Sequence, residues 1–151
     1  MLIAVFLFSL PPYYLNVQTY LRLYNNYNAY NIYAPKPLMN AFKYLEKMTL
    51  DQSVILSGEF VSSMVPAFSH NRTILGRDDC APDYYTKQPL AFDFLNGKMD
   101  QTQAKAFLNK YSVAYILFGA DTHKFEDLPY GGYPFLKKVF RDGSVIVVKV
   151  N

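Results

Sequence analysis

Side chains that could bind a ligand gather in the stretch 54–79, which holds two short apolar runs, 54–56 and 73–75, each followed by a glycine with polar neighbours. If both runs are parallel strands, their carboxyl ends meet at one edge of a sheet, where free amides and helix N-termini commonly bind ligands. The sequence therefore predicts a ligand crevice at that edge. Its candidate ligand-binding residues are Glu59, His70, Arg72, Arg77 and Asp78.

These residue types allow two interpretations. A carboxylate such as Glu59 at the start of a helix could act as a general base or bind a sugar hydroxyl, but it could also do no more than interact with the helix dipole. Arg72 and Arg77 could hold a phosphate or a sugar. Alternatively, they form a solvated ion-pair loop with Asp78.

The motifs of the common enzyme classes are missing from the sequence. It contains no G-x-S-x-G nucleophile elbow, no G-x-G-x-x-G and no Walker pattern. His70 and His123 lie far apart, and Cys80 is the single cysteine, so no metal-ligand spacing occurs. We therefore predict no catalytic residue, no metal site and no cofactor in this chain.

Charge and composition narrow the possible partners. The net charge is +3, with Lys and Arg scattered among Asp and Glu, so no basic stripe is available for a nucleic acid. Charged residues make up 18 % of the chain, which is low for a soluble domain and indicates a membrane or partner surface. The tripeptide Asn71-Arg72-Thr73 matches the N-glycosylation sequon, which has a role only in an extracytoplasmic domain of a glycosylating host.

Hydrophobic periodicity and capping residues predict an α/β domain. It has a mixed sheet, parallel in its centre and closed by a C-terminal antiparallel hairpin, with helices on both faces. We expect Pro66 to interrupt the second helix, Asp83 to cap the third and Pro89 to kink or split it. Asp100 and Gln103 predict a capping box. The expected helices are 38–48, 59–68, 83–95 and 101–110, and the expected strands are 54–56, 73–75, 113–118, 136–141 and 144–150, with a turn at 142–143.

The N-terminal ten residues, MLIAVFLFSL, form half of a membrane span and end at Pro11. They fit the tail of a transmembrane helix better than a signal peptide, because no basic residue precedes them. A buried strand or helix is the third alternative. A tyrosine-rich, Lys/Arg-poor segment follows, as expected on the non-cytoplasmic side of a membrane. We therefore divide the chain into 1–34, a span end with an exit helix, and 35–151, an extracytoplasmic α/β domain.

The order of these features resembles the C-terminal extracytoplasmic domain of polytopic membrane proteins similar to GT-C-type glycosyltransferases. The resemblance rests on the helix AFKYLEK, the strand VILSG, the stretch VPAFSHNRTILGR, the helix YYTKQPLAFDFLNG, the strand VAYILFG and the ending FLKKVFRDGSVIVVKV. Such enzymes use lipid-phosphate-linked sugars, and their acidic catalytic residues lie in loops among the membrane helices. No such loop is present here, so the resemblance carries no catalytic residue onto this sequence.

The resemblance implies a non-catalytic domain that shapes or caps the acceptor side of a membrane-embedded site. Its partners would be the membrane, the missing transmembrane portion, and a lipid-linked sugar or glycan acceptor. Two alternatives remain open. One is a membrane-tethered extracytoplasmic binding module for a small sugar or phosphate, and the other is a small enzyme that uses Glu59, Asp78 or Asp79 as acid or base.

Overall fold

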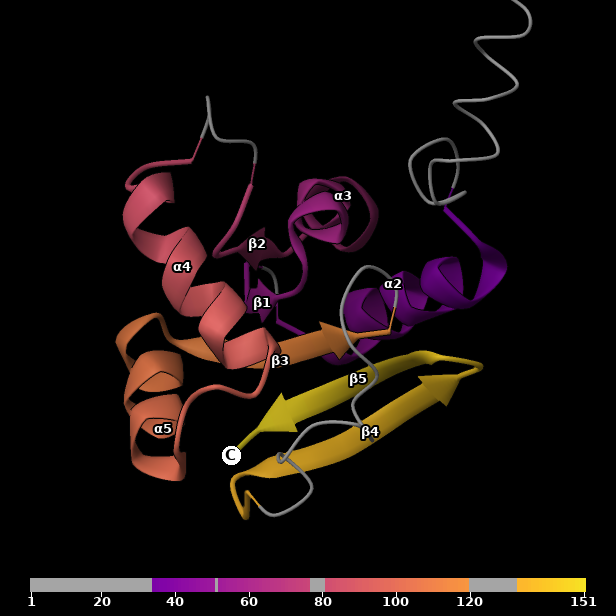
Figure 1. Ribbon diagram of the computed structural model, residues 1–151. Coiled ribbons are helices and arrows are strands. Elements are labelled where there is room, and N and C mark those ends of the chain that lie inside the picture. Colours follow the sequence, from indigo (N-terminus) through magenta and orange to yellow (C-terminus); the bar gives the residue numbers. More distant parts are fainter. Residues whose placement is uncertain (1–33, 51, 77–80, 120–132) are drawn as a thin grey trace, which may run out of the picture. The chain divides into compact units, whose positions relative to one another are not determined.

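The computed structural model describes residues 34–50, 52–76, 81–119 and 133–151, and nearly all of these belong to one unit, Lys36–Asn151 (Figure 1). The predicted span end and exit helix, 1–34, lie almost entirely outside the described residues. The described elements are α2 (Lys36–Met48), β1 (Val54–Leu56), α3 (Glu59–Ser69), β2 (Arg72–Thr73), α4 (Tyr84–Leu95), α5 (Gln101–Lys110), β3 (Val113–Phe118), β4 (Leu136–Asp142) and β5 (Val145–Val150).

The five strands form one mixed sheet in the order β2-β1-β3-β5-β4. Strand β1 pairs in parallel with β2 on one side and with β3 on the other. Strand β5 pairs antiparallel with β3 and with β4, which closes the C-terminal hairpin. The predicted fold class, with a parallel centre and a C-terminal antiparallel hairpin, is confirmed.

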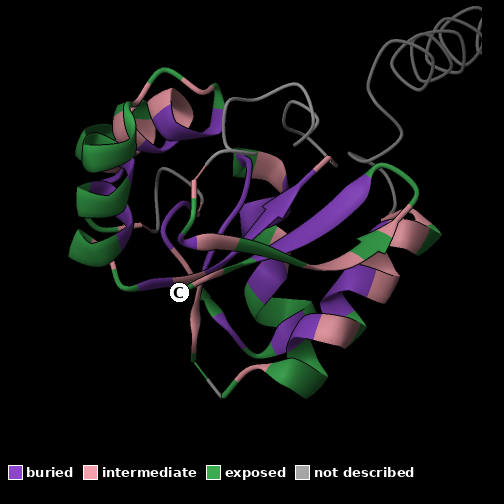
Figure 2. Ribbon diagram, turned by 90° about the horizontal axis from the view of Figure 1, so that it is seen from below, coloured by how far each residue is buried: buried purple, intermediate pink, exposed green. Residues whose placement is uncertain are grey.

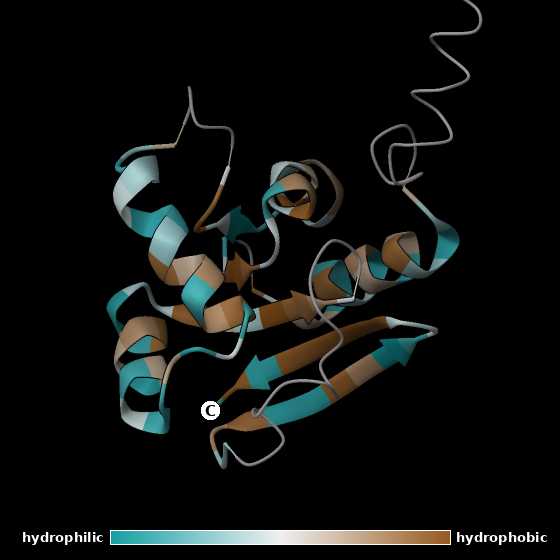
Figure 3. Cartoon of the chain, viewed as in Figure 1, coloured by the Kyte–Doolittle hydropathy of each residue, from teal (hydrophilic) through white to brown (hydrophobic). Residues whose placement is uncertain are grey.

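Helices cover both faces of this sheet because the chain crosses it in opposite directions. Helix α3 leads from β1 to β2, whereas α4 and α5 lead from β2 past β1 to β3. Since both crossovers must be right-handed, they run over opposite faces. The apolar residues of β1, β3 and β5 are enclosed between the two helix layers, with the exposed helix faces turned outward (Figures 2 and 3).

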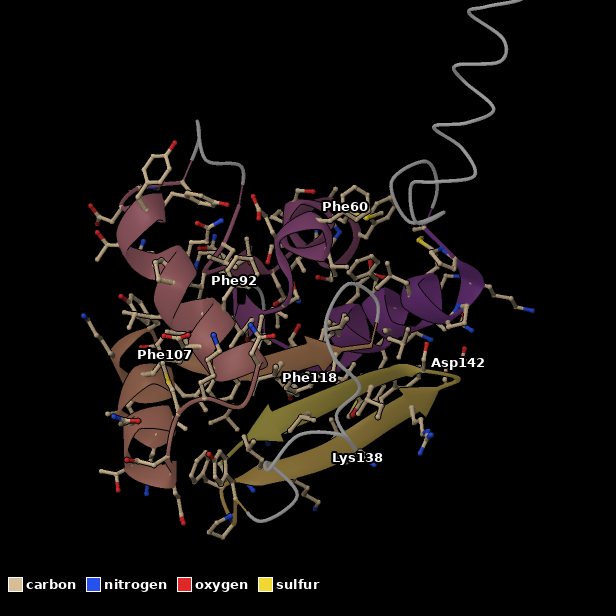
Figure 4. All side chains as sticks on the ribbon, viewed as in Figure 1. Phe60, Phe92, Phe107, Phe118, Lys138 and Asp142 are labelled. Atoms are coloured by element: carbon tan, nitrogen blue, oxygen red, sulfur yellow. The ribbon has the colours of Figure 1, made fainter. Side chains whose placement is uncertain are left out.

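The side chains of β1 show this division. Leu56 belongs to the cluster that includes Phe94 of α4 and Phe107 of α5, whose rings stack at 5.7 Å between centroids. Ile55 is equally buried but points to the other face, because neighbouring strand residues alternate. Figure 4 marks Phe107 on its helix and Phe118 on β3, both members of the first cluster.

The predicted interruption of the second helix at Pro66 was wrong, and the third helix is not split at Pro89. Helix α3 continues through Pro66 and α4 continues through Pro89. Each proline removes one backbone hydrogen bond, but burial of the inward face stabilises each helix. The buried residues of α3 are Val61, Ser62, Val65 and Ser69.

The cap of α4 also differs from expectation. Asp83 has the left-handed backbone angles φ 56° and ψ 29°, and its side chain makes no capping hydrogen bond. An N-cap residue normally has an extended backbone, which directs its carboxylate at the free amides. Here the Asp83 carbonyl accepts from the amides of Thr86 and Lys87 instead.

Other boundaries follow the sequence closely. Helix α5 has the predicted capping box, in which Asp100 accepts from the Gln103 amide at 2.8 Å and Gln103 accepts from the Asp100 amide at 3.1 Å. Strand β2 begins one residue earlier than predicted and has only two residues. The hairpin loop consists of Gly143 and Ser144, one residue later than predicted.

Helix α2 contacts the C-terminal hairpin through a hydrogen bond and an aromatic pair. Asn40 donates to the Asp142 carboxylate at 2.7 Å, and Tyr44 stacks on Phe140 with 5.0 Å between ring centroids. Figure 4 shows Asp142 at the hairpin end that lies beside α2. The first described helix therefore packs on the last two strands of the sheet.

Gly119, directly after β3, permits a close approach of its backbone to the hairpin loop. Its φ is +89°, and a Cβ atom at this position would lie 1.7 Å from the Ser144 carbonyl oxygen. Any side chain would therefore separate the end of β3 from the hairpin loop. Gly76 is different, because its added Cβ would lie 3.5 Å from the Ala81 Cβ, an ordinary contact.

We expect Gly119→Ala to lower the free energy of unfolding by about 2–4 kcal/mol, because the strained φ and the collision with the Ser144 carbonyl act together. Gly76→Ala should stay within about 0.5 kcal/mol of the parent chain. Urea unfolding followed by circular dichroism measures both. Equal stability of the two variants would contradict this account of Gly119.

Two partly buried tyrosines have raised pKa values. Burial, and secondarily the nearby Asp100 carboxylate, raises the pKa of Tyr133, whose hydroxyl donates to the Met99 carbonyl at 2.7 Å. Burial, with a smaller contribution from Tyr115, raises the pKa of Tyr44. The native state thus keeps both phenols protonated at a pH where the unfolded chain releases the protons.

The stability that Tyr133 supplies is complete below the unfolded tyrosine pKa of about 10 and is lost as pH rises through the raised folded pKa. We expect Tyr133→Phe to unfold more easily near neutral pH but to lose less stability between about pH 9 and pH 11. Urea titrations across this range measure the slope. An unchanged slope would show that Tyr133 does not titrate differently in the two states.

Candidate functional site

The carboxyl ends of β1 and β3 form the edge where a crevice was predicted. The chain leaves β1 toward β2 and leaves β3 toward the opposite side of the sheet, and such divergence opens space between adjacent strand ends. At this edge Ser57 is fully buried, and its hydroxyl lies 2.9 Å from the hydroxyl of Ser62. Gly58 is the N-cap residue of α3 and has no side chain to occupy the helix N-terminus.

Glu59, the first residue of α3, links α3 to α4. Its carboxylate accepts a hydrogen bond from the hydroxyl of Tyr84 and a longer one, at 3.4 Å, from the amide of Gln88. Gln88 also donates to the Tyr84 hydroxyl at 2.8 Å. Only 4 % of Tyr84 is exposed, so the carboxylate is held by a buried phenol. This geometry accounts for Glu59 as a structural link between two helices.

Tyr85 is the exposed aromatic residue of this edge. It follows Tyr84 in the first turn of α4, 75 % of it is accessible, and its ring meets that of Tyr84 edge-on at 5.4 Å. An exposed ring next to a tyrosine that is bonded to a carboxylate offers an apolar face with polar neighbours, which suits contact with a sugar, a peptide or lipid head groups.

His70 and Arg72 lie at the other end of the sheet. His70 ends α3 just before β2 and lies 3.7 Å from the Glu46 carboxylate. Arg72 is paired with Val54, the first residue of β1, and its Nε donates to the Gln52 carbonyl at 3.1 Å. The structure therefore separates these two residues from Glu59, although all three were predicted at one crevice.

Two shallow grooves follow the outer edge of β2. One, of about 730 Å³, includes His70 and Arg72, and the other, of about 320 Å³, runs from Asn71 to Gly76 and then to Pro82 and Lys87. Arg72 lines both grooves. The second groove therefore connects Arg72 to Gly76, the residue that precedes Arg77 and Asp78.

Several predicted features lie outside the described residues, among them Arg77, Asp78 and the apolar run 1–10. Within the described ranges, no three His, Cys, Asp or Glu side chains lie close enough together to hold a metal ion. None of the helices in these ranges has the length and hydrophobicity needed to cross a bilayer.

The sequence interpretation missed the partners of Glu59. Tyr84 and Gln88 lie four residues apart, so a helix places them on one face, and this spacing was readable as a polar pair. Their meeting with Glu59 depends on how α3 and α4 pack, which no local pattern encodes. It also missed Lys87, whose ammonium donates to the Pro82 carbonyl at 2.8 Å and lines the groove shared with Arg72.

We expect Tyr84→Phe to reduce the free energy of unfolding by about 1 kcal/mol, since it removes the phenol that donates to a partly solvated carboxylate. Tyr85→Phe, on the exposed neighbour, is the matched control and should change stability by less than about 0.5 kcal/mol. Urea unfolding compares the two variants. If Tyr84→Phe still weakens the domain equally when Glu59→Gln is already present, the link between the two residues does not exist.

Comparison with known proteins identifies a fold neighbour. No family model matches the sequence, and no curated protein matches it significantly. Among solved structures, the C-terminal globular domain of an oligosaccharyltransferase from Archaeoglobus fulgidus superposes with a TM-score of 0.60 and 10 % sequence identity. The match covers 79 % of this chain and 99 % of that domain. At this identity the likeness establishes that the two share a fold.

Proposed function

We propose that this chain is the soluble, non-catalytic domain of a membrane glycosyltransferase-like protein, located on the extracytoplasmic side. Its role is to shape or cap the acceptor side of a membrane-embedded site. The observation that carries this proposal is the shared fold with an oligosaccharyltransferase globular domain, nearly all of which is covered. The apolar run 1–10 and the tyrosines after it support a membrane attachment.

The carboxyl edge of β1 is the surface best suited to this role. Ser57 and Glu59 already have protein partners, the former with Ser62 and the latter with Tyr84 and Gln88. A residue that serves as a general base must reach the proton that it removes, and here the carboxylate is engaged by α4. The edge presents the ring of Tyr85 outward, so recognition or packing fits it better than chemistry.

A second candidate is a binding module for a small sugar or phosphate. It is favoured by the groove along β2, where the side chains of Arg72 and Lys87 line the same volume of about 320 Å³. Two cations on one groove suit a phosphate oxygen. In this candidate the chain is tethered to the membrane by its N-terminal segment and binds its ligand by itself.

The test compares membranes from cells that carry the native gene, a deletion, or a single substitution. Membranes are incubated with radiolabelled UDP-glucose and GDP-mannose, and lipid-linked and protein-linked label are counted. We expect the deletion to lose one labelled product and Tyr85→Ala to reduce it about tenfold, the effect of losing one aromatic contact worth roughly 1.4 kcal/mol. The purified 151-residue chain should transfer no sugar.

Leu50→Ala is the matched control, because Leu50 is 86 % exposed but lies before β1, at the opposite edge. It should leave the labelled product unchanged. Equal losses in both variants, or transfer by the purified chain, would contradict the proposal. Calorimetric binding of glucose 1-phosphate to the purified chain, abolished by Arg72→Ala, would instead establish the binding module.

A further inference from the structure

Asn71 begins the sequon Asn71-Arg72-Thr73, yet only 2 % of it is exposed. Its side-chain nitrogen donates to the hydroxyl of Thr49 at 2.9 Å and to the carbonyl of Ser69 at 2.7 Å. An asparagine amide carries two hydrogens, so these two bonds use both. The nitrogen that would receive a glycan is thus fully committed inside the domain.

The two acceptors belong to the ends of two helices. The Thr49 hydroxyl donates in turn to the Leu45 carbonyl at 2.6 Å, in the last turn of α2. Ser69, itself buried, donates to the Val65 carbonyl at 2.8 Å, in the last turn of α3. Asn71 therefore joins the C-terminal ends of α2 and α3 directly before β2.

We propose that Asn71 is a glycan acceptor only in the unfolded chain, and that its glycosylation and the native fold exclude each other. In the transfer, the Asn71 nitrogen forms a bond to the anomeric carbon of a sugar phosphate donor. The bond from that carbon to the phosphate oxygen breaks, its electron pair leaves with the phosphate, and one amide proton is released. The modified nitrogen keeps one hydrogen, so it cannot make both bonds to Thr49 and Ser69.

The third residue of the sequon supports this exclusion. The Thr73 hydroxyl oxygen is buried and has no hydrogen-bond partner among the described residues. The side-chain carbonyl oxygen of Asn71 is likewise buried and unpartnered there. On the folded domain, therefore, neither the asparagine amide nor the threonine hydroxyl of the sequon is accessible to a modifying enzyme. The inference does not depend on the proposed function, because it concerns only the accessibility of the sequon.

The test uses the full chain with a second Asn-Arg-Thr sequence in a tail added after Asn151. The probe is UDP-glucose with a soluble enzyme that glucosylates Asn-x-Ser/Thr sequons, and peptide mass mapping locates the hexose. On the folded chain we expect the tail to be modified and Asn71 to be modified at least a hundredfold more slowly, because it reacts only during global unfolding. Adding Gly119→Val, which destabilises the sheet through the collision with the Ser144 carbonyl, should raise the rate at Asn71 toward that of the tail.

A second measurement does not need the enzyme. In the folded chain, side-chain amide hydrogens of Asn71 should exchange with solvent at least a hundredfold more slowly than those of Asn109, which is exposed on α5. Asn71→Asp should raise the unfolding equilibrium constant about tenfold, and Asn109→Asp should leave it nearly unchanged. Equal modification of Asn71 and the tail, or equal exchange of Asn71 and Asn109, would overturn the proposal.

Discussion

The position of the short strand β1 between β2 and β3 determines the rest of this domain. Both Ile55 and Leu56 are fully buried, one against each helix layer, although the strand has only three residues. Because its neighbours are reached by crossovers in opposite directions, the helices must divide between the two faces. The same arrangement directs the carboxyl ends of β1 and β3 to one end of the sheet, where Gly58 is the N-cap of α3 and Gly119 meets the hairpin loop.

This topology places the charged residues that the sequence predicted at one site at opposite ends of the sheet. Residues that precede a parallel strand lie at one end of the sheet, and residues that follow it lie at the other end. His70 and Arg72 precede or begin β2, whereas Glu59 comes after β1, so they reach opposite edges despite lying within fourteen sequence positions. At each edge the side chain is engaged by a neighbour from another element: Glu46 for His70 and Tyr84 for Glu59.

The sequence predicted correctly those elements that depend only on residues near one another in the chain. The apolar run of β3 and the capping box of Asp100 and Gln103 depend only on nearby residues, and both matched. The effect of Pro66 and the conformation of Asp83 depend on tertiary packing, and both differed from expectation. The network of Glu59, Tyr84 and Gln88 joins helices separated by a strand, so it became visible only once their relative positions were known. Two members of the predicted basic and acidic cluster, Arg77 and Asp78, lie outside the described residues.

The hydrogen bond from Asn40 to Asp142 limits how early α2 can reach its final position during synthesis. These residues are 102 positions apart, and Tyr44 with Phe140 spans nearly the same separation. During synthesis from the N-terminus, α2 must wait for about a hundred further residues before its final neighbours exist. The packing of α2 against the hairpin is therefore a late folding event. The residues before α2 have been synthesised well before this domain can reach its final structure.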